Sequence, residues 1–261
     1  MRILIPILIA ACSMLPVVVS ASASVPPPHY EYAKCLFTDG ADRLPYRMLS
    51  PEKTEEGVSY PLVIFLHGSG ERGTDNESQL AHGASMFSNP VNASRYPAYV
   101  VFPQCKEKTW TGRVDESTFM PGAGLPDESR TEELVVGLVD DLIRSYPIDR
   151  DRIYIVGISM GAIAAYDLVC RYPSLFAAAV PICGAVNPER LEAAKNVSFM
   201  IFHGEEDDEI PSICSREAYK ALHSAGAEVD YVEFAGTGHD CWTLAFNTPT
   251  LLPWLFAQSR H

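Results

Sequence analysis

The sequence predicts an α/β protein with a mostly parallel central sheet covered by helices on both faces. Residues 62–66 form a continuous apolar run, which is typical of a strand buried on both faces. Further strand-like runs alternate with helix-like segments, and this alternation favours a parallel sheet. At 261 residues the chain has room for one large domain of this kind. The other predicted parallel strands span residues 99–102, 153–156, 178–182, 197–202 and 229–234.

Local signals predict the remaining elements. Residues 33–37 and 44–49 are short strand candidates, which we expect to pair as an antiparallel hairpin at one edge of the sheet. Ser129 and Glu132 have the spacing of a capping box, so a helix is expected to begin there. A further helix is expected from about residue 212 to residue 225, and an apolar helix is expected to close the chain.

Composition and charge exclude some classes of partner. The formal net charge is −13, and no basic stripe exists that would release counterions from phosphate, so we expect no nucleic-acid partner. Hydrophobic residues make up 47% of the chain and charged residues 20%, as in an ordinary globular protein. Neither a C-x-x-C motif nor a His/Cys cluster predicts a metal, and no cofactor is expected. The sequence gives no signal for the oligomeric state.

Residues 1–23 have the features of a secretory signal peptide. Arg2 precedes a mostly apolar stretch, and Ala21-Ser22-Ala23 forms a small-residue cleavage site. The apolar stretch is too short for a stable membrane span. An alternative interpretation takes residues 9–12 as a lipoprotein signal, with Cys12 as the lipidated residue. Both interpretations predict an exported protein whose folded domain spans residues 24–261.

The most informative local motif is Gly157-Ile158-Ser159-Met160-Gly161, which joins an apolar strand to an apolar helix. A tight strand-to-helix turn forces unusual backbone angles and close packing, which glycine tolerates at the flanking positions. The turn lifts the serine hydroxyl to the edge of the sheet and places the Met160 N–H at a helix N-terminus, where it can stabilise an oxyanion. We therefore predict that Ser159 is a nucleophile.

A serine nucleophile needs a general base and an acid. When the serine lies on a strand-to-helix turn of this kind, the acid and then the histidine follow it in the sequence, so we expect both downstream of Ser159. His239 follows the last predicted strand, and the carboxyl ends of parallel strands meet at one edge of the sheet. We predict that His239 accepts the Ser159 proton and that an acid orients its imidazole. The acid is expected within the acidic run at 205–209, where Asp207 is the first choice and Asp208 the second.

The loop after the first central strand has two interpretations. Gly68, Gly70 and Gly73 match the dinucleotide-binding pattern, but no apolar helix follows at once and the next strand does not end in an acidic residue. We expect instead that this loop supplies a backbone N–H, that of Ser69, as the second oxyanion donor beside that of Met160. Glycine there would let a substrate carbonyl approach the backbone.

Several motifs together resemble the exported α/β-hydrolases described as predicted peptidases or as phospholipase/carboxylesterase-like, which are similar to feruloyl esterases and polyhydroxybutyrate depolymerases. The resemblance covers about residues 40–258 and implies an α/β-hydrolase fold, a serine esterase that forms an acyl-enzyme, and Asp207 as the acid. One departure is Gly161-Ala162-Ile163, where the family usually has a Gly-Gly-aromatic run. The motifs are those at 66–76 and 103–105, the serine turn, and those at 181–184, 203–211 and 238–242.

Aromatic and charged residues near these motifs suggest a substrate class. Residues 104–130 show no clean period, and we interpret them as a flap beside the substrate that carries Trp110, with a packed surface loop as the alternative. Trp110 and Trp242 are expected to overhang the nucleophile, with Arg72 and Glu71 at the rim. Aromatic faces stack on sugar or phenolic rings. We therefore predict short or aromatic acyl esters of small molecules or polysaccharides as substrates. The alternative interpretation places both tryptophans in the core.

Two other functional classes stay open. A serine peptidase of the prolyl-oligopeptidase-like type would use the same nucleophile, base and acid. A binding protein on a hydrolase scaffold would normally have lost one of Ser159, Asp207 and His239, and all three are present.

The cysteine count permits disulfides in an exported protein. Cleavage after Ala23 leaves six cysteines, which allow fifteen pairings. If Asp207 touches His239, Cys214 and Cys241 are brought into one neighbourhood, so we hypothesise a disulfide between them. The other four cysteines are Cys35, Cys105, Cys170 and Cys183.

Overall fold

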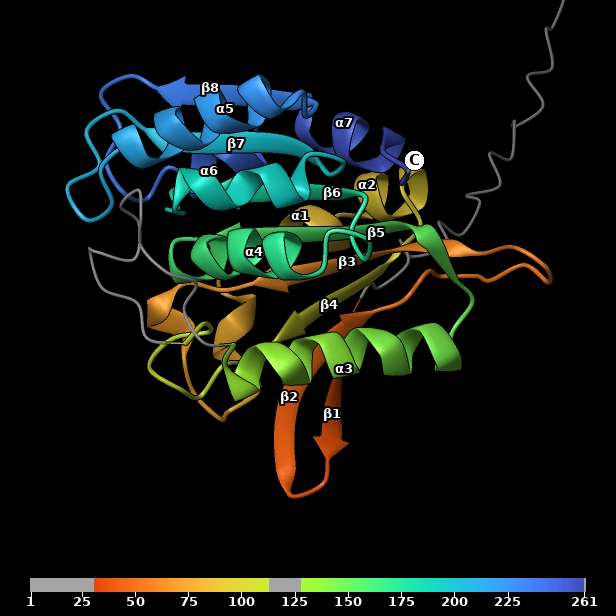
Figure 1. Cartoon of the computed structure of the whole chain (residues 1–261). Coiled ribbons are helices and arrows are strands. Elements are labelled where there is room, and N and C mark those ends of the chain that lie inside the picture. Colours follow the sequence, from red (N-terminus) through yellow and green to blue (C-terminus); the bar gives the residue numbers. More distant parts are fainter. Residues whose placement is uncertain (1–30, 113–127, 261) are drawn as a thin grey trace, which may run out of the picture.

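An eight-stranded sheet forms the centre of the computed structural model, which describes residues 31–112 and 128–260 (Figure 1). The strand order is β1-β2-β4-β3-β5-β6-β7-β8. From β4 to β8 all neighbours are parallel, whereas β1 and β2 pair antiparallel with each other and β2 pairs antiparallel with β4. The strands are β1 Ala33–Asp39, β2 Asp42–Leu49, β3 Tyr60–Leu66, β4 Tyr99–Pro103, β5 Ile148–Ile158, β6 Ala178–Ile182, β7 Ser198–Gly204 and β8 Val229–Phe234.

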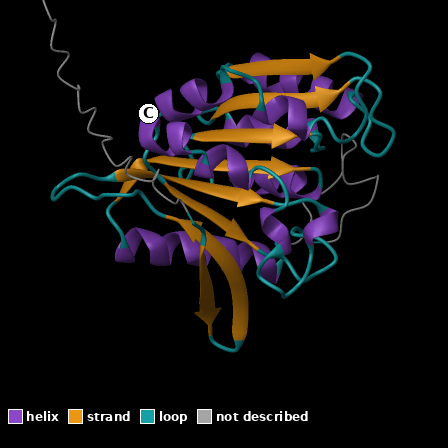
Figure 2. Ribbon diagram, turned by 180° about the vertical axis from the view of Figure 1, so that it is seen from behind, coloured by secondary structure: helices purple, strands orange, loops and turns teal. Residues whose placement is uncertain are grey.

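Helices cover both faces of the sheet (Figures 1 and 2). Helices α3, α4 and α5 pack on one face, and α1, α6 and α7 pack on the other. The α-helices are α1 Ala84–Ser88, α2 Pro90–Arg95, α3 Arg130–Ser145, α4 Met160–Arg171, α5 Ile213–Ala225, α6 Trp242–Phe246 and α7 Leu251–Ala257. Short 3-10 helices are η1 Ser69–Glu71, η2 Ser78–Leu80 and η4 Pro188–Ala194.

The apolar run of β3 explains why the sheet has a core on each side. Successive side chains of a strand point to opposite faces. Leu62, Ile64 and Leu66 therefore join the core beneath α3, α4 and α5, whereas Val63 and Phe65 join the core beneath α1, α6 and α7. All five are fully buried, and each such side chain stabilises the fold by about 1.5–3 kcal/mol relative to exposure.

The predicted fold class is confirmed, and so are two of its local details. Strands β1 and β2 form the expected antiparallel hairpin at the sheet edge. Ser129 caps α3, with the Ser129 hydroxyl accepting from the Glu132 N–H and the Glu132 carboxylate accepting from the Ser129 N–H. The expected apolar helix that closes the chain is α7, and a further short helix, α6, precedes it. Sequence reasoning did not predict α1 and α2.

Two predicted features lie outside the described residues. The signal peptide at 1–23 is one, and most of the expected flap, residues 113–127, is the other. Within residues 31–112 and 128–260, no helix is long and apolar enough to cross a membrane.

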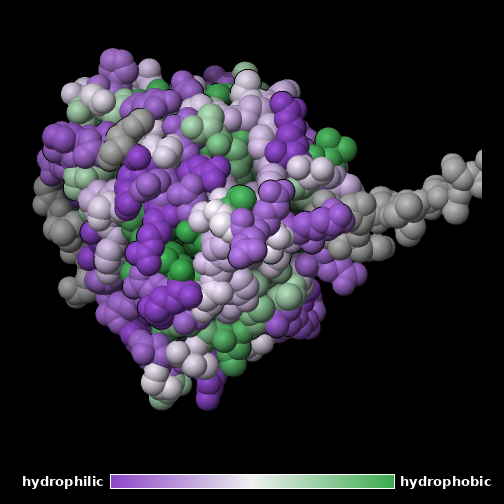
Figure 3. Space-filling model, turned by 90° about the vertical axis from the view of Figure 1, so that its right-hand side faces the viewer, coloured by the Kyte–Doolittle hydropathy of each residue, from purple (hydrophilic) through white to green (hydrophobic). Residues whose placement is uncertain are grey.

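The parallel strands all point toward one end of the sheet, at the left of Figure 1 and at the right of Figure 2. We call this end, where the carboxyl ends of the strands meet, the carboxyl edge. The nucleophile motif and the predicted acid and base follow strands at this edge. Figure 3 views the opposite edge, where mostly hydrophilic residues surround small apolar patches. The side chains of the predicted nucleophile, acid and base therefore gather at the carboxyl edge, as expected for an open parallel sheet.

Candidate active site

Ser159 occupies a strained turn between β5 and α4. Its φ of 51° and ψ of −117° are unusual for a residue other than glycine. A Cβ at Gly157 would lie 2.2 Å from the Gly161 carbonyl O, and one at Gly161 would lie 2.0 Å from the Leu66 carbonyl O. Only glycine fits at these two positions. The close packing holds the Ser159 side chain at the carboxyl edge of the sheet, where it is partly exposed.

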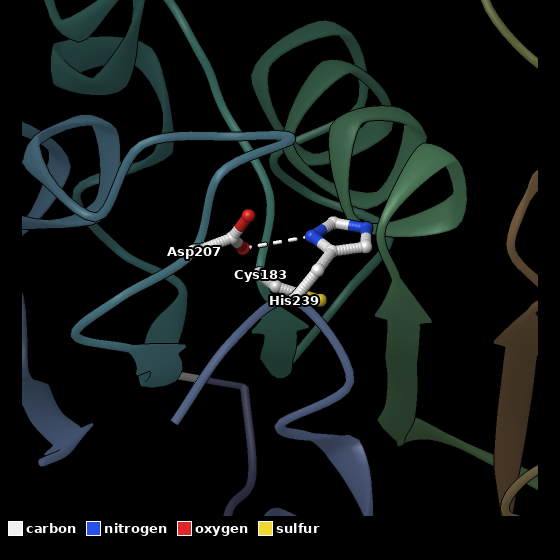
Figure 4. A group of neighbouring side chains, drawn as sticks. All are labelled: Cys183, Asp207 and His239. Carbon is white, nitrogen blue, oxygen red and sulfur yellow. Dashed lines mark hydrogen bonds and ion pairs between the residues drawn. The ribbon is translucent and has the colours of Figure 1, made fainter. Parts of the chain in front are cut away.

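Ser159, His239 and Asp207 form one hydrogen-bonded chain. His239 Nε2 lies 2.8 Å from Ser159 Oγ, and His239 Nδ1 lies 2.7 Å from Asp207 Oδ2. In Figure 4, Asp207 and His239 point toward each other from separate loops. Because an ionised carboxylate can only accept, the imidazole proton sits on Nδ1, and Nε2 is left to accept the Ser159 hydroxyl proton. Activation of a serine nucleophile requires this arrangement.

The structure distinguishes the two candidate acids. Asp207 is buried, and its Oδ1 accepts hydrogen bonds from the Glu209 and Ile210 N–H groups, both at 2.9 Å. Asp208 is exposed. A Cβ at Gly204 would lie 2.1 Å from the Gly238 carbonyl O, so this glycine lets the acid loop press against the loop that carries His239.

Two backbone N–H groups at the first residues of helices lie near Ser159 in the chain or in space. Met160 is the first residue of α4 and Ser69 is the first residue of η1, so neither amide is used within its own helix. A Cβ built on Gly68 would lie 3.7 Å from the Ser159 Cβ, so the loop that carries Ser69 runs directly beside the nucleophile. These are the two amides that the sequence predicted as oxyanion donors.

His67 fixes the orientation of the Ser69 peptide. The Cys105 N–H donates to His67 Nε2 at 3.0 Å, so the ring proton is on Nδ1, which donates to the Gly68 carbonyl O at 2.6 Å. In a trans peptide the N–H points away from the C=O, so tying the Gly68 carbonyl inward turns the Ser69 N–H outward. Burial lowers the pKa of His67 to about 4, which keeps the ring neutral.

Trp110 does not overhang the nucleophile as predicted. Its side chain is only 1% exposed, and its Nε1–H donates to the His67 carbonyl O at 3.0 Å. The indole ring also packs against the His67 ring, with centroids 4.8 Å apart. The His67 carbonyl accepts from its one polar atom, so the ring can be buried without an unpaired donor. It lies beneath residues 67–73, which we call the oxyanion loop. The core interpretation is therefore the correct one for Trp110.

The other predicted rim residues lie near the site with different roles. Arg72 donates to the Ser69 carbonyl O at 2.6 Å and to the Lys108 carbonyl O at 3.0 Å, so it anchors the oxyanion loop. The Glu71 carboxylate and the Ser159 side chain both lie against Gly68: a Cβ on Gly68 would be 3.1 Å from Glu71 Oε2 and 3.7 Å from the Ser159 Cβ. Trp242 is partly exposed beside His239, with ring centroids 5.7 Å apart at 90°.

A pocket of about 420 Å³ lies beside Trp242. The Trp242 ring contacts both His239 and His82, and its centroid is 5.2 Å from that of His82. His82 Nε2 lies 3.6 Å from Glu71 Oε1, which links the pocket wall to the oxyanion loop. Sequence reasoning missed His82, because no motif surrounds it. Polar and aromatic residues share the lining, which includes His82, Ser85, Asn89, Asn92, Trp242, Phe246 and Asn247.

The predicted Cys214–Cys241 disulfide is wrong: all six cysteines among the described residues are free. Cys241 is fully buried, and its thiol is hydrogen-bonded with that of Cys183. Figure 4 shows the Cys183 sulfur beside the His239 ring. Ligand atoms of Cys183, Asp207 and His239 lie within 4.8 Å of one another, but the Asp207 and His239 atoms already bond each other.

The fold and this hydrogen-bonded chain at the carboxyl edge of the sheet define an α/β hydrolase. More particularly, the model of the phospholipase/carboxylesterase family matches residues 51–248, and the chain belongs to that family.

Three relatives illustrate the range of similar proteins. Poly(3-hydroxyalkanoate) depolymerase C of Paucimonas lemoignei is 31% identical over 127 residues, which are 48% of this chain and 28% of the relative; the chain thus spans less than a third of that protein. The crystal structure of a thermostable esterase is 32% identical, with a TM-score of 0.82, over 88% of this chain and 64% of the other. A ferulic acid esterase of Anaeromyces mucronatus shares the fold, with 15% identity and a TM-score of 0.65 over 92% of this chain and 93% of the other.

Proposed function

We propose that the protein is a serine esterase that forms an acyl-enzyme on Ser159. The observation that carries the proposal is the continuous hydrogen-bonded chain from Ser159 Oγ through His239 to Asp207. Membership in the phospholipase/carboxylesterase family supports the same reaction class.

The proposed reaction has two halves. Ser159 Oγ attacks the ester carbonyl carbon while His239 Nε2 takes the hydroxyl proton, and the carbonyl oxygen becomes an oxyanion stabilised by the Ser69 and Met160 N–H groups. His239 then gives the proton to the leaving alkoxide, which departs as the alcohol and leaves the acyl group on Ser159. In the second half His239 removes a proton from water, the hydroxide attacks the acyl carbon, and Ser159 leaves with the proton returned to it.

The alcohol part of the substrate is proposed to bind in the pocket beside Trp242. Because His239 must protonate the leaving oxygen, the alcohol lies on the His239 side of Ser159, and Trp242 is on that side. The pocket combines an indole face with amide groups of Asn89, Asn92 and Asn247. Such a lining suits a ring with several hydroxyl groups better than an alkyl chain.

The acyl part is proposed to be short or aromatic. One relative of the same fold was solved in complex with ferulic acid, an aromatic acid. A feruloylated or acetylated sugar would place an aromatic or short acyl group at Ser159 and a sugar in the pocket. The polar groups at the mouth, Glu71, His82 and Arg72, would disfavour a long alkyl chain there.

Ester hydrolysis by purified protein tests the reaction class. We expect activity on p-nitrophenyl acetate and on feruloylated or acetylated oligosaccharides, and labelling of Ser159 by a fluorophosphonate. Ser159→Ala and His239→Ala should each abolish hydrolysis of both kinds of ester. A peptide panel in the same assay tests the serine peptidase alternative. Cleavage of peptides but not of esters would replace the esterase proposal, and residual activity near wild type in either variant would contradict the triad.

Trp242→Ala tests the substrate class, with Trp242→Phe as the matched control that keeps an aromatic face. We expect Trp242→Ala to lower kcat/KM about tenfold on the sugar ester, since loss of one aromatic contact removes roughly 1 kcal/mol or more. The effect on p-nitrophenyl acetate should be smaller, and Trp242→Phe should stay near wild type on both. Equal losses on both substrates, or octanoyl and longer esters as the best substrates, would contradict the carbohydrate-ester proposal.

Export is proposed from residues 1–23. Fractionation of cells that express the full chain tests it, with mass spectrometry of the mature N-terminus. Cleavage after Ala23 is expected; a lipid on Cys12 would support the alternative anchor, and an intact Met1 would contradict both.

A further inference from the structure

His203 lies directly behind the acid and is fully buried at the end of β7. Its ring makes three polar contacts. Nδ1 lies 2.6 Å from the Ser215 hydroxyl, and Nε2 lies 2.8 Å from the Ile210 carbonyl O and 3.1 Å from Asp207 Oδ2. The side chains of His203 and Asp207 are both 0% exposed, so no water competes for these contacts. The reaction described above gives His203 no role.

The partners of His203 define where its proton is. A backbone carbonyl and a carboxylate can only accept, so Nε2 must carry the hydrogen. Burial lowers the pKa of His203, so the ring is neutral and carries one proton. Nδ1 is therefore an acceptor, and the Ser215 hydroxyl donates to it. In this way Ser215, from α5, selects the tautomer that presents an N–H to the acid loop.

The Nε2–H group holds the acid loop at two points. It ties the Ile210 carbonyl, and the Ile210 N–H in turn donates to Asp207 Oδ1 at 2.9 Å. It also faces Asp207 Oδ2, the same oxygen that accepts from His239 Nδ1. Asp207 thus has two backbone donors on Oδ1, the His239 Nδ1–H donor on Oδ2, and the His203 Nε2–H group 3.1 Å from that same oxygen. A carboxylate with this many donors can be buried as an anion in a single orientation.

We propose that His203, locked as the Nε2–H tautomer by Ser215, is a positioning residue that orients Asp207 and moderates its pull on the His239 proton. Loss of the His203 N–H would leave Asp207 Oδ2 with His239 as its remaining side-chain donor. The carboxylate would then attract the imidazolium more strongly and would be free to rotate. This inference rests on the proposed function, because it assigns a role within the same triad.

His203→Leu and His203→Gln test the proposal as a pair. Leucine removes the N–H, whereas the glutamine amide can place one near the position of Nε2. We expect His203→Leu to lower kcat roughly 10- to 100-fold, comparable to the loss on removing a partner that orients a metal ligand, with KM nearly unchanged. His203→Gln should restore most of the kcat. Equal kcat values in the two variants would overturn the proposal.

The pH profile is the readout that a merely structural role would not move. The groups that face His239 are Asp207, Glu209 with its Oε2 3.7 Å from Nε2, and the thiol of Cys183; His203 lies behind Asp207. Since the imidazolium gains stabilisation without the His203 donor, the acidic limb of kcat/KM should move to higher pH in His203→Leu and return in His203→Gln. An unmoved limb in a folded His203→Leu would overturn the proposal.

Ser215→Ala keeps the test decisive if His203→Leu does not fold. It leaves the ring in place but removes the donor that selects the tautomer, so a smaller loss of kcat and a shift of the acidic limb in the same direction are expected. The matched control is Ser198→Ala, a buried serine on β7 whose hydroxyl bonds Glu228 at 3.2 Å, away from the triad. Equal kinetics in the two alanine variants would overturn the proposal.

Wild-type protein separates the two proposals. Absence of any ester hydrolysis that depends on Ser159 would contradict the proposed function. Wild-type hydrolysis together with unaltered kinetics in all His203 and Ser215 variants would contradict only the role of His203.

Discussion

Two His-Gly corners, His67-Gly68 just after β3 and His203-Gly204 at the end of β7, stand at the same edge of the sheet and use their imidazoles in opposite ways. Both rings are buried, and burial lowers the pKa of each. His67 carries its proton on Nδ1, because a backbone N–H donates to Nε2. His203 carries its proton on Nε2, because carbonyl and carboxylate oxygens surround that atom.

The difference teaches that the neighbours of a buried histidine, rather than its place in a motif, decide what it orients. The Nδ1–H of His67 turns a peptide so that the Ser69 N–H faces the expected oxyanion. The Nε2–H of His203 holds the loop of the expected acid. The His67 corner orients a donor for the negative charge that develops on the substrate oxygen. The His203 corner orients the carboxylate that stabilises the positive charge that develops on His239.

The largest expected effect comes from the group that the second corner holds. Asp207→Asn should lower kcat by about 10⁴, because the amide favours the wrong imidazole tautomer. Asp208→Asn is the matched control, since Asp208 is exposed one residue further along, and its kcat should stay near wild type. Initial rates on p-nitrophenyl acetate measure both. A larger loss in Asp208→Asn would move the acid by one residue.

Swapped amide substitutions give the next largest effect and test the opposite tautomers directly. An asparagine amide overlaps the Nδ1 position of histidine, and a glutamine amide overlaps the Nε2 position. His67→Leu should lower kcat on the order of 10²-fold, the lower end for loss of an oxyanion donor. His67→Asn should recover more of that loss than His67→Gln.

At His203 the ranking should reverse, with Gln above Asn. Measurement of kcat for all four amide variants shows whether the ranking inverts between the corners. The same ranking at both positions would contradict the opposite tautomers.

Protonation of His67 should lower the free energy of unfolding as the pH falls. The folded-state pKa of His67 is about 4, below the ordinary value of 6.5, so the unfolded chain takes up a proton that the folded chain refuses. The contribution of His67 is therefore present above pH 6.5 and is lost as the pH falls toward 4. Its size is about 3 kcal/mol, at 1.36 kcal/mol for each pKa unit.

Urea unfolding at pH 7 and pH 4.5 measures this loss. His67→Asn, which cannot titrate, should show a smaller difference in free energy of unfolding between the two pH values than the wild type. An equal difference would mean that the buried ring is protonated without penalty. His203 shifts in the same direction, so His203→Gln should also reduce the difference.

Much of the site could be predicted from residues because its geometry is enforced locally. The glycines around Ser159 and the strand ends placed Ser159, Asp207 and His239 at one edge, and their hydrogen bonds are those expected. The side on which an aromatic ring lies could not be predicted in the same way. Trp110 and Trp242 both follow candidate strand ends, yet one is buried beneath the oxyanion loop and the other borders the pocket.

The roles of His67 and His203 were missed for the same reason. A histidine before a glycine is compatible with a simple turn, and its function depends on donors that come from distant segments. Cys105 and Ser215 supply those donors, and nothing in the local sequence around either histidine marks them. The Cys214–Cys241 pairing failed similarly, because the Cys241 thiol turns toward Cys183.

The smallest expected effect on activity comes from a third buried group, Glu132 on α3, which has fewer hydrogen-bond donors than Asp207. Only one of its carboxyl oxygens has a backbone donor, the Ser129 N–H. Desolvation, and next the charge of Asp167, raise the pKa of Glu132 to about 9, so the carboxyl is protonated in the folded state at neutral pH. The unfolded chain ionises it near pH 4.5. Stability is therefore lost progressively as the pH rises from about 4.5 toward 9.

Glu132→Gln should remove that loss without changing kcat. The amide keeps an oxygen for the Ser129 N–H and, like a protonated carboxyl, carries no charge beside Asp167. We expect the free energy of unfolding of the variant, relative to that of the wild type, to rise by up to about 1.4 kcal/mol per pH unit between pH 5 and pH 8. Urea unfolding at both pH values measures the gain. An equal loss of stability at both pH values would show that Glu132 is ionised in the fold, and that a buried carboxylate here needs fewer donors than Asp207 has.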